Sequence, residues 1–198
     1  MNSKTTLGLE LPTDPRWAEL ASMQLEDILT DHAYCEQKAA SSMISIITLH
    51  PERELIVEKL APVVTEEWGH FRMVLKELKK RNLKLGRQRP DLYVKELQKG
   101  KLKGANREDL LLDQLLMCAL IEARSCERFK ILSEILKDHE LSDFYHQFMV
   151  AEAGHYKLFL QLANHYFNHE KVSQRWKSWL TFEAEIMKNM ELRADRMH

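Results

Sequence analysis

Two Glu-x-x-His motifs lie far apart in the chain, and their residue types could do chemistry together. The first is Glu67 with His70 in "EEWGHF", and the second is Glu152 with His155 in "AEAGHY". On a helix, residues three apart share one face, so each motif presents a carboxylate and an imidazole side by side. Burying such groups costs free energy unless they are paired or bind a cation. The motifs therefore suggest metal binding.

A glutamate in the preceding helix accompanies each motif. Glu36 lies 31 residues before Glu67, and Glu122 lies 30 residues before Glu152. In two antiparallel helices with a tight turn, and with a rise of about 1.5 Å per residue, this separation places the isolated glutamate level with its motif. Four carboxylates and two imidazoles would then converge at one height of a helical bundle.

A single Glu-x-x-His motif is weak evidence, because the chain is rich in glutamate and contains nine histidines. A lone histidine on an apolar helix face is more often an ordinary core residue. Asp143 and His146 have the same spacing but no glutamate at the matching distance. Glu66 and Glu127 are rivals by type, but their helical phase turns them away from the predicted face. The evidence for a metal site is that the motif occurs twice, each time with a glutamate at the matching distance in the preceding helix.

The ligand types indicate which cation such a site would hold. Sites rich in carboxylate oxygen with some imidazole suit iron or manganese, whereas thiolate sites suit zinc. We expect two iron ions, with Glu67 and Glu152 bridging them, as in the di-iron and di-manganese carboxylate bundles. No catalytic residue is predicted beyond the metal ligands. The predicted ligands are Glu36, Glu67, His70, Glu122, Glu152 and His155.

Apolar periodicity predicts helices throughout and no strand. The predicted helices cover residues 15–49 and 52–83, a short segment at 92–98, a segment from the cap Asn106 to Leu136, a segment from the cap Ser142 through Leu162, and residues 171–190. Tight connections make two antiparallel hairpins, and the link of about twenty residues between them is typical of ferritin-like bundles. We expect an all-α, ferritin-like four-helix bundle with one long crossover and an extra C-terminal helix, as a single di-iron domain over residues 1–198.

Composition excludes several classes of protein. The chain has no run of 18 or more apolar residues, which excludes a transmembrane helix. Its first residues lack the apolar segment of a signal peptide. Cys35, Cys118 and Cys126 form no Cys-x-x-Cys pair and are expected to be reduced thiols. We therefore expect a cytoplasmic protein.

A basic segment, residues 76–107, stands out in a chain that is nearly neutral only as a whole. Residues 76–107 contain twelve cations and three anions, a net charge of +9, although the whole chain carries −1. Proteins that bind RNA phosphates need such cations, although a charge run is commonly just a solvated face. Tyr93 is a candidate for stacking on an unpaired base. The predicted RNA contacts are Lys79, Lys80, Arg81, Lys84, Arg87, Arg89, Lys99, Lys101 and Lys103.

The stretches "CEQKAA", "EEWGHF", "IEARSCERF" and "AEAGHYKLF" together resemble the bacterial tRNA hydroxylase family that acts on 2-methylthio-N6-isopentenyl-adenosine. The resemblance covers most of the chain, and the six predicted ligands match without substitution. It implies an O2-dependent, non-haem di-iron monooxygenase that hydroxylates the isopentenyl side chain beside the anticodon. It also implies a tRNA substrate and an external electron donor protein or reductase.

Other functions stay open at this level. A ferritin-like protein that scavenges peroxide or oxidises iron would use a similar bundle, as would a di-iron hydroxylase of another substrate, such as a quinone. An RNA-binding bundle that has lost catalysis is disfavoured because all six ligands are present. The sequence does not identify the electron donor, and it leaves a monomer and a small homo-oligomer as alternatives.

Overall fold

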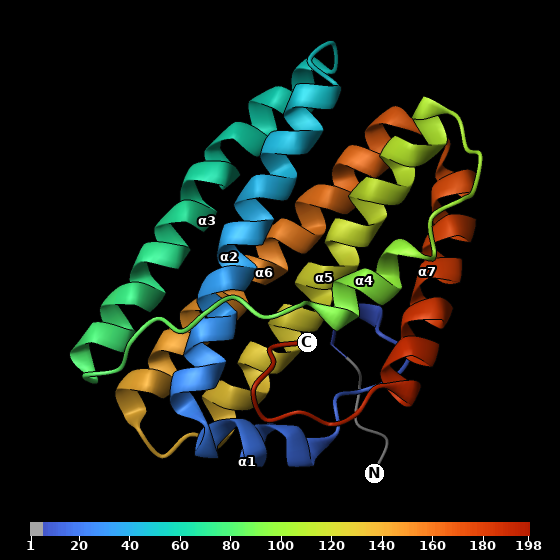
Figure 1. Ribbon diagram of the computed structural model, residues 1–198. Helices are drawn as coiled ribbons and strands as arrows, with labels where there is room; N and C mark the ends of the chain where they lie inside the picture. The colour runs from blue at the N-terminus through green and yellow to red at the C-terminus, as the bar shows by residue number, and fades with distance from the viewer. Residues whose placement is uncertain (1–5) are drawn as a thin grey trace. The chain divides into compact units, whose positions relative to one another are not determined.

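The computed structural model describes residues 6–198, and this part of the chain is helical with no strand. Figure 1 shows the order of the elements. They are η1 (Thr6–Gly8), α1 (Pro15–Met23), α2 (Leu25–Leu49), α3 (Glu54–Lys80), α4 (Leu92–Gln98), α5 (Arg107–Ile135), α6 (His139–Tyr166) and α7 (His169–Asn189).

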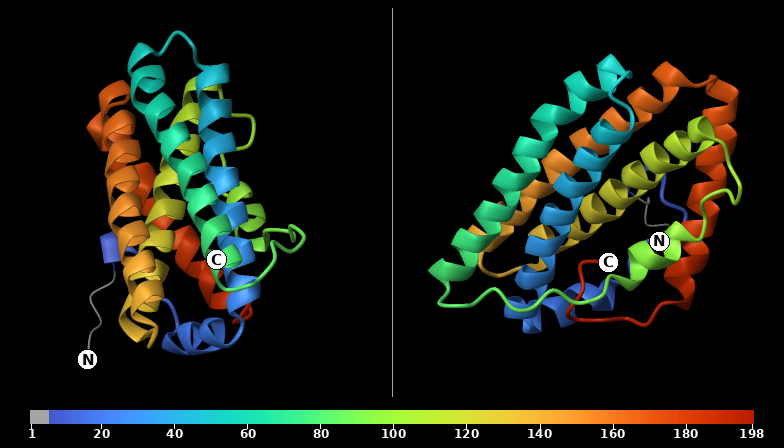
Figure 2. Two further views of the ribbon diagram at one scale, coloured as in Figure 1. Left: turned by 90° about the vertical axis from the view of Figure 1, so that its left-hand side faces the viewer. Right: turned by 45° about the horizontal axis from the view of Figure 1, so that its top comes forward.

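The chain divides into two compact units. The first-hairpin unit contains residues 20–90 and 193–197, so that α2 and α3 form its antiparallel pair (Figure 2). The second-hairpin unit contains the segment that ends at Glu19, residues 91–192 and His198. Within it α5 pairs with α6, and both α4 and α5 contact α7. The hairpins agree with the predicted connections, while the single domain over 1–198 stays a prediction.

The first hairpin follows the predicted pattern except for one interruption in its first helix. The expected helix over 15–49 is interrupted at Gln24, whose backbone leaves the helical region at φ −124° and ψ 52°. The second helix continues from Glu54 to Lys80 through Pro62, even though proline removes one backbone donor inside a helix. Its buried residues recur every three or four positions, which directs one face of α3 into the interior.

Side-chain caps define where the helices of the second hairpin begin. The Asn106 side chain accepts a hydrogen bond from the Asp109 N–H at 2.9 Å, so the predicted cap is confirmed. The predicted cap Ser142 is wrong, because α6 begins one turn earlier and Asp138 caps it by accepting from the Leu141 N–H at 3.2 Å. With Asp138 as the cap, the Ser142 hydroxyl donates to the Ser133 carbonyl at 2.5 Å instead.

Helix α5 is buried on almost every side between residues 111 and 129. Its buried positions include polar and charged residues as well as apolar ones, so its sequence shows no simple apolar stripe. Asp113 is one of them: it accepts from Arg175 at 2.5 Å, from the Trp179 indole at 3.1 Å and from the Leu102 N–H at 2.9 Å. These bonds tie the loop after α4 to α5 and α7.

The same loop passes close to α7 at Gly100. A Cβ atom at this position would lie 2.6 Å from the Phe182 ring and 2.9 Å from the Trp179 ring. Such distances are too short for carbon atoms, so only glycine fits here without moving two aromatic side chains. The loop is therefore held at a fixed place within the second-hairpin unit.

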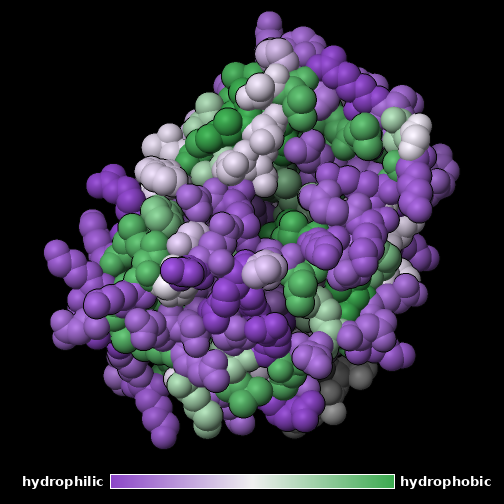
Figure 3. All heavy atoms as spheres, in the orientation of Figure 1, coloured by the Kyte–Doolittle hydropathy of each residue, from purple (hydrophilic) through white to green (hydrophobic). Residues whose placement is uncertain are grey.

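Among residues 6–198 no helix is both long and apolar enough to cross a membrane. Figure 3 shows one face on which hydrophilic side chains are widespread and hydrophobic ones form separate groups.

Candidate metal centre

The first-hairpin unit contains a triad of predicted ligands. Glu36 on α2 and both Glu67 and His70 on α3 are buried. His70 Nδ1 lies 3.1 Å from Glu67 Oε2 and 3.4 Å from Glu36 Oε2. One donor atom of each residue lies within 4.8 Å of the other two. The hairpin therefore places the isolated glutamate level with its Glu-x-x-His motif, as predicted.

The second-hairpin unit contains a matching triad. Glu122 on α5 and both Glu152 and His155 on α6 are buried. His155 Nδ1 lies 3.6 Å from Glu152 Oε2, and one donor atom of each of the three residues lies within 4.8 Å of the others. Each hairpin thus builds its own cluster of two carboxylates and one imidazole.

The chemistry of each triad fits a divalent cation. Two carboxylates buried within a few ångströms repel each other, and a cation bound between them would offset this repulsion. Carboxylate oxygens with one imidazole nitrogen form a donor set suited to iron or manganese. The ligands come from rigid helices, which hold them in place without a mobile loop. Both triads are compatible with the metal content of a di-iron protein.

The rival glutamates lie elsewhere. Glu66 is exposed, and its carboxylate is 3.9 Å from His70 Nε2 on the outer side of the imidazole. Glu127 is buried but accepts hydrogen bonds from the Thr13 N–H at 3.0 Å and the Thr13 hydroxyl at 2.7 Å, and it pairs with Arg124. Neither glutamate belongs to either triad.

A buried histidine beside the first triad was not predicted. His32 is fully buried one turn before Glu36, and its Nε2 lies 2.8 Å from Glu36 Oε1. It therefore contacts the carboxylate oxygen opposite the one that faces His70. The signal was available in the sequence, because residues four apart meet on a helix face.

A buried ionic network in the second-hairpin unit was also missed. The Arg124 guanidinium donates from Nε to Glu183 Oε1 at 2.8 Å and from Nη2 to Glu183 Oε2 at 2.9 Å. It also donates to Glu127, to the Thr13 hydroxyl at 3.1 Å and to the Leu11 carbonyl at 2.8 Å. Arg124 thereby joins α5, α7 and the N-terminal segment two residues beyond a predicted ligand.

The cysteines of α5 behave as buried thiols. Burial raises the pKa of Cys118 to about 12. Burial, and next the charge of Glu152, raises the pKa of Cys126 to about 12, and its thiol donates to the Met149 carbonyl at 3.4 Å. Both thiols are therefore protonated at neutral pH.

The residues predicted to contact RNA differ in their exposure and in their ion-pair partners. Within the first-hairpin unit, Arg81 pairs with Glu77 at 2.6 Å, and Arg89 pairs with Asp195 at 2.8 Å and with Asp27 at 3.1 Å. These two arginines are half-buried and stabilise the unit itself. The exposed candidates there are Lys79, Lys80, Lys84 and Arg87.

The second-hairpin unit holds the remaining candidates. Lys99 pairs with Glu96 at 2.6 Å, Lys101 is half-buried and Lys103 is exposed. The suggestion that Tyr93 stacks on a base is wrong. Tyr93 is buried, its ring stacks on His198 at 5.0 Å, and its hydroxyl donates to Glu183 at 3.3 Å. The apolar periodicity of α4 turns this tyrosine inward.

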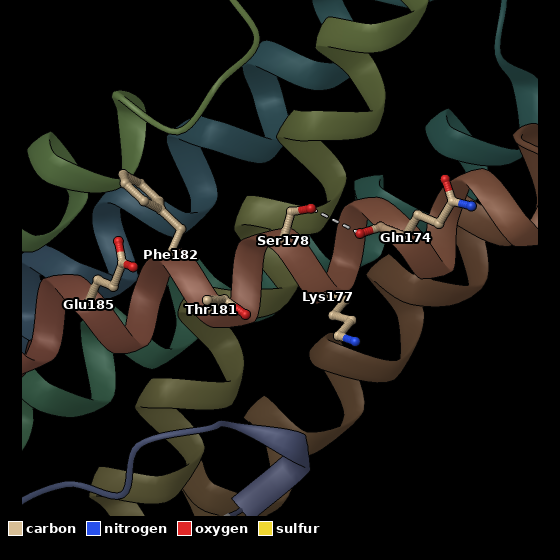
Figure 4. Close-up of a pocket in the computed structure, with 6 residues that line it drawn as sticks. All are labelled: Gln174, Lys177, Ser178, Thr181, Phe182 and Glu185. Carbon is tan, nitrogen blue, oxygen red and sulfur yellow. Dashed lines mark hydrogen bonds between the residues drawn. The ribbon is translucent and has the colours of Figure 1, made fainter.

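One cavity of about 480 Å³ lies along the outer side of α7 (Figure 4). Its lining residues all belong to this one helix, and the Ser178 hydroxyl donates to the Gln174 carbonyl beside it at 3.1 Å. None of the predicted ligands lines this cavity, so it is separate from the candidate metal centre.

Comparison with known proteins gives a consistent result. The family model described as tRNA-(MS[2]IO[6]A)-hydroxylase (MiaE) matches residues 2–198. A tRNA 2-(methylsulfanyl)-N(6)-isopentenyladenosine(37) hydroxylase from Pseudomonas putida is 34% identical over 181 residues, which cover 91% of this chain and 87% of the relative. The protein of the same name from Salmonella typhimurium is 26% identical over 230 residues, with coverages of 90% and 83%.

A solved structure is similar over almost the whole chain. It is described as Protein 43 with aldehyde deformylating oxygenase activity from Synechococcus, with a TM-score of 0.90 and 31% identity, covering 96% of this chain and 94% of its own. The predicted all-α, ferritin-like fold class is confirmed. Because the family model spans nearly every residue, the chain belongs to the tRNA-(MS[2]IO[6]A)-hydroxylase family.

Proposed function

We propose that this protein hydroxylates the isopentenyl side chain of 2-methylthio-N6-isopentenyl-adenosine next to the anticodon of tRNA, with O2 as co-substrate. The observation that carries the proposal is the family match over residues 2–198 in a chain that retains both complete ligand triads. The relatives from Pseudomonas putida and Salmonella typhimurium are named for this reaction.

The proposed cofactor is a pair of iron ions held by both triads. The residues that would hold the ions are Glu36, Glu67 and His70 of the first triad and Glu122, Glu152 and His155 of the second. When bound, the iron ions supply the redox chemistry that activates O2, with electrons from an external donor protein or reductase. The chain itself supplies six ligands on rigid helices and a buried environment. Buried ligands keep water away from the reacting groups, and rigid ones keep the cations at fixed positions.

A second candidate is deformylation of an aldehyde by an oxygenase. The observation that favours it is the 31% identity to a solved protein described as having aldehyde deformylating oxygenase activity. The family match and the basic segment favour the tRNA substrate instead. A charge of +9 within residues 76–107 would attract a polyanion such as tRNA, whereas it would not attract a neutral aldehyde.

The test follows oxygen from O2 into the product. The reduced, iron-loaded protein is supplied with labelled O2 and tRNA that contains the modified adenosine, and the nucleosides are analysed by mass spectrometry. We expect one labelled oxygen atom in the isopentenyl group and none when only the water is labelled. A parallel assay offers a long-chain aldehyde, and a third offers hydrogen peroxide. Turnover of the aldehyde or of peroxide with unchanged tRNA would contradict the proposal.

A further inference from the structure

An outward stripe on α3 has a composition that the metal centre does not explain. It consists of Trp68, Arg72, Lys76 and Lys79, which follow each other at steps of four, four and three residues. Such steps place side chains along one helix face. All four are exposed, and the buried residues of α3 occupy the opposite face. We call this set the α3 stripe.

The cations of the α3 stripe are not neutralised by the protein. Among residues 6–198, no carboxylate lies within ion-pair distance of Arg72, Lys76 or Lys79, whereas the neighbouring Arg81 is paired with Glu77. Like charges four residues apart, such as Arg72 and Lys76, destabilise a helix slightly. The helix dipole favours cations only in the last turn, which accounts for Lys79 but not for Arg72. An anionic partner outside this unit would remove the repulsion.

Trp68 gives this charged face an aromatic surface. Its exposed fraction is 48%, whereas Trp17 and Trp179 are fully buried and Trp176 is half-buried against Tyr156. Among the described residues it is therefore the most exposed tryptophan. Its ring rests on Phe71, with centroids 5.0 Å apart and planes at 33°. Phe71 supports the indole from one side, which leaves aromatic surface open to a flat partner.

We propose that the α3 stripe binds single-stranded RNA, with Trp68 stacking on an unpaired base and Arg72, Lys76 and Lys79 contacting phosphates. A cationic track beside an aromatic side chain is the combination that single strands require. The proposal rests on the tRNA substrate proposed above and assigns a contact surface to it. An acidic electron-donor protein would also match the cations, but it gains nothing specific from an open indole face, so we commit to RNA.

The first experiment observes Trp68 directly and needs no metal. The full-length protein, as purified, is titrated with a synthetic RNA hairpin that has the stem and loop of an anticodon arm and only unmodified nucleotides. We expect the hairpin to quench the tryptophan fluorescence of the wild type. In Trp68→Phe most of this quenching should be lost. Equal quenching in both proteins would overturn the stacking contact.

The second experiment measures affinity. Trp68→Ala should bind the hairpin about tenfold more weakly, whereas Trp68→Phe should retain most of the affinity because it keeps an aromatic face. The triple variant Arg72→Gln, Lys76→Gln, Lys79→Gln should lower the slope of log affinity against log salt by about two units. The matched control neutralises three exposed lysines of α6 and α7, Lys157, Lys177 and Lys188. It should change the slope much less.

Measurements of folding and of catalysis distinguish the possible reasons why a variant binds RNA more weakly. Helical circular dichroism and thermal midpoints of all variants should match the wild type, because none of the changed residues is buried. Turnover of the free modified nucleoside is measured for the wild type and for the control variant of Lys157, Lys177 and Lys188, in which it should be unchanged, and this tests the proposed function independently of RNA binding. If Trp68→Ala binds RNA like the wild type, or if both triple variants lose affinity equally, the inference is wrong. Loss of reduction by the electron donor with intact RNA binding would assign the stripe to that protein instead.

Discussion

At the scale of single residues, the contact between His32 and Glu36 is the strongest addition to the six predicted ligands. A carboxylate that binds a metal through one oxygen is oriented by whatever its other oxygen contacts. Here Glu36 Oε1 lies 2.8 Å from His32 Nε2 while Oε2 faces His70. His32 is therefore placed to fix the rotamer of this predicted ligand in the absence of a metal.

His32→Ala should lower the affinity for iron by about 10- to 100-fold, as is usual when a residue behind a metal ligand is removed. The iron affinity is measured by an anaerobic titration with ferrous iron. The thermal midpoint of the iron-free protein is measured as well, to check that the fold is intact. His50→Ala is the matched control, because His50 is equally buried at the end of the same helix, about 21 Å of helix rise from Glu36. Equal iron affinity of both variants would contradict the role of His32.

At the scale of the helices, Arg124 determines how α5, α7 and the N-terminal segment are joined. Its guanidinium donates hydrogen bonds to five oxygen atoms of four residues, Glu183, Glu127, Thr13 and Leu11, and the side chain is fully buried. Removing one member of such a buried pair leaves the other charge without compensation, which is far more costly than the net value of the pair.

We expect Arg124→Met to lower the free energy of unfolding of the second-hairpin unit by about 3–5 kcal/mol. The measurement is urea unfolding of the iron-free protein. The double variant Arg124→Met, Glu183→Leu should recover part of the loss, because it removes the carboxylate left unpaired in the single variant. If the double variant is as unstable as the sum of both single variants, the network does not act as a unit.

The helices themselves could be predicted from the sequence, and their details only in part. The stripes of α2 and α3 follow one apolar face, so periodicity located Glu36, Glu67 and His70 on it. Between residues 111 and 129, helix α5 is buried on almost every side and has no contrasting polar face, so periodicity gave no sign of the Arg124 network. The start of α6 was misplaced because Asp138 and Ser142 are both good caps, and the choice depends on tertiary contacts.

At the scale of the whole molecule, the chain returns at its end to an element that it formed near its beginning. Residues 193–197 pack in the first-hairpin unit, where Arg196 pairs with Asp31 at 2.8 Å and the Met197 N–H donates to Asp31 at 2.7 Å. These partners are more than 160 residues apart, and no local pattern links them. Long-range contacts of this kind could not be predicted from one sequence.

The matched triads lead to a prediction for the molecule as a whole. If Glu67 and Glu152 bridge two iron ions, the iron-loaded protein should contain about two ions per chain. Glu67→Ala and His155→Ala should each lose most of both ions, although each changes only one hairpin. The iron-free fold should survive these changes, because removing a carboxylate also relieves repulsion within the triad.

The stability of the folded protein with and without iron distinguishes one shared metal centre from two independent metal sites. An ion at about a hundredfold excess over its dissociation constant stabilises the folded state by about 2.7 kcal/mol. In a shared centre, ferrous iron under nitrogen should raise the unfolding midpoint of both units in the wild type and of neither unit in Glu67→Ala. Hydrogen exchange of amides in α3 and in α6 reports the two units separately. If Glu67→Ala keeps one ion and iron still protects α6, each hairpin binds its own metal, and the bridged pair and the single di-iron domain are both excluded.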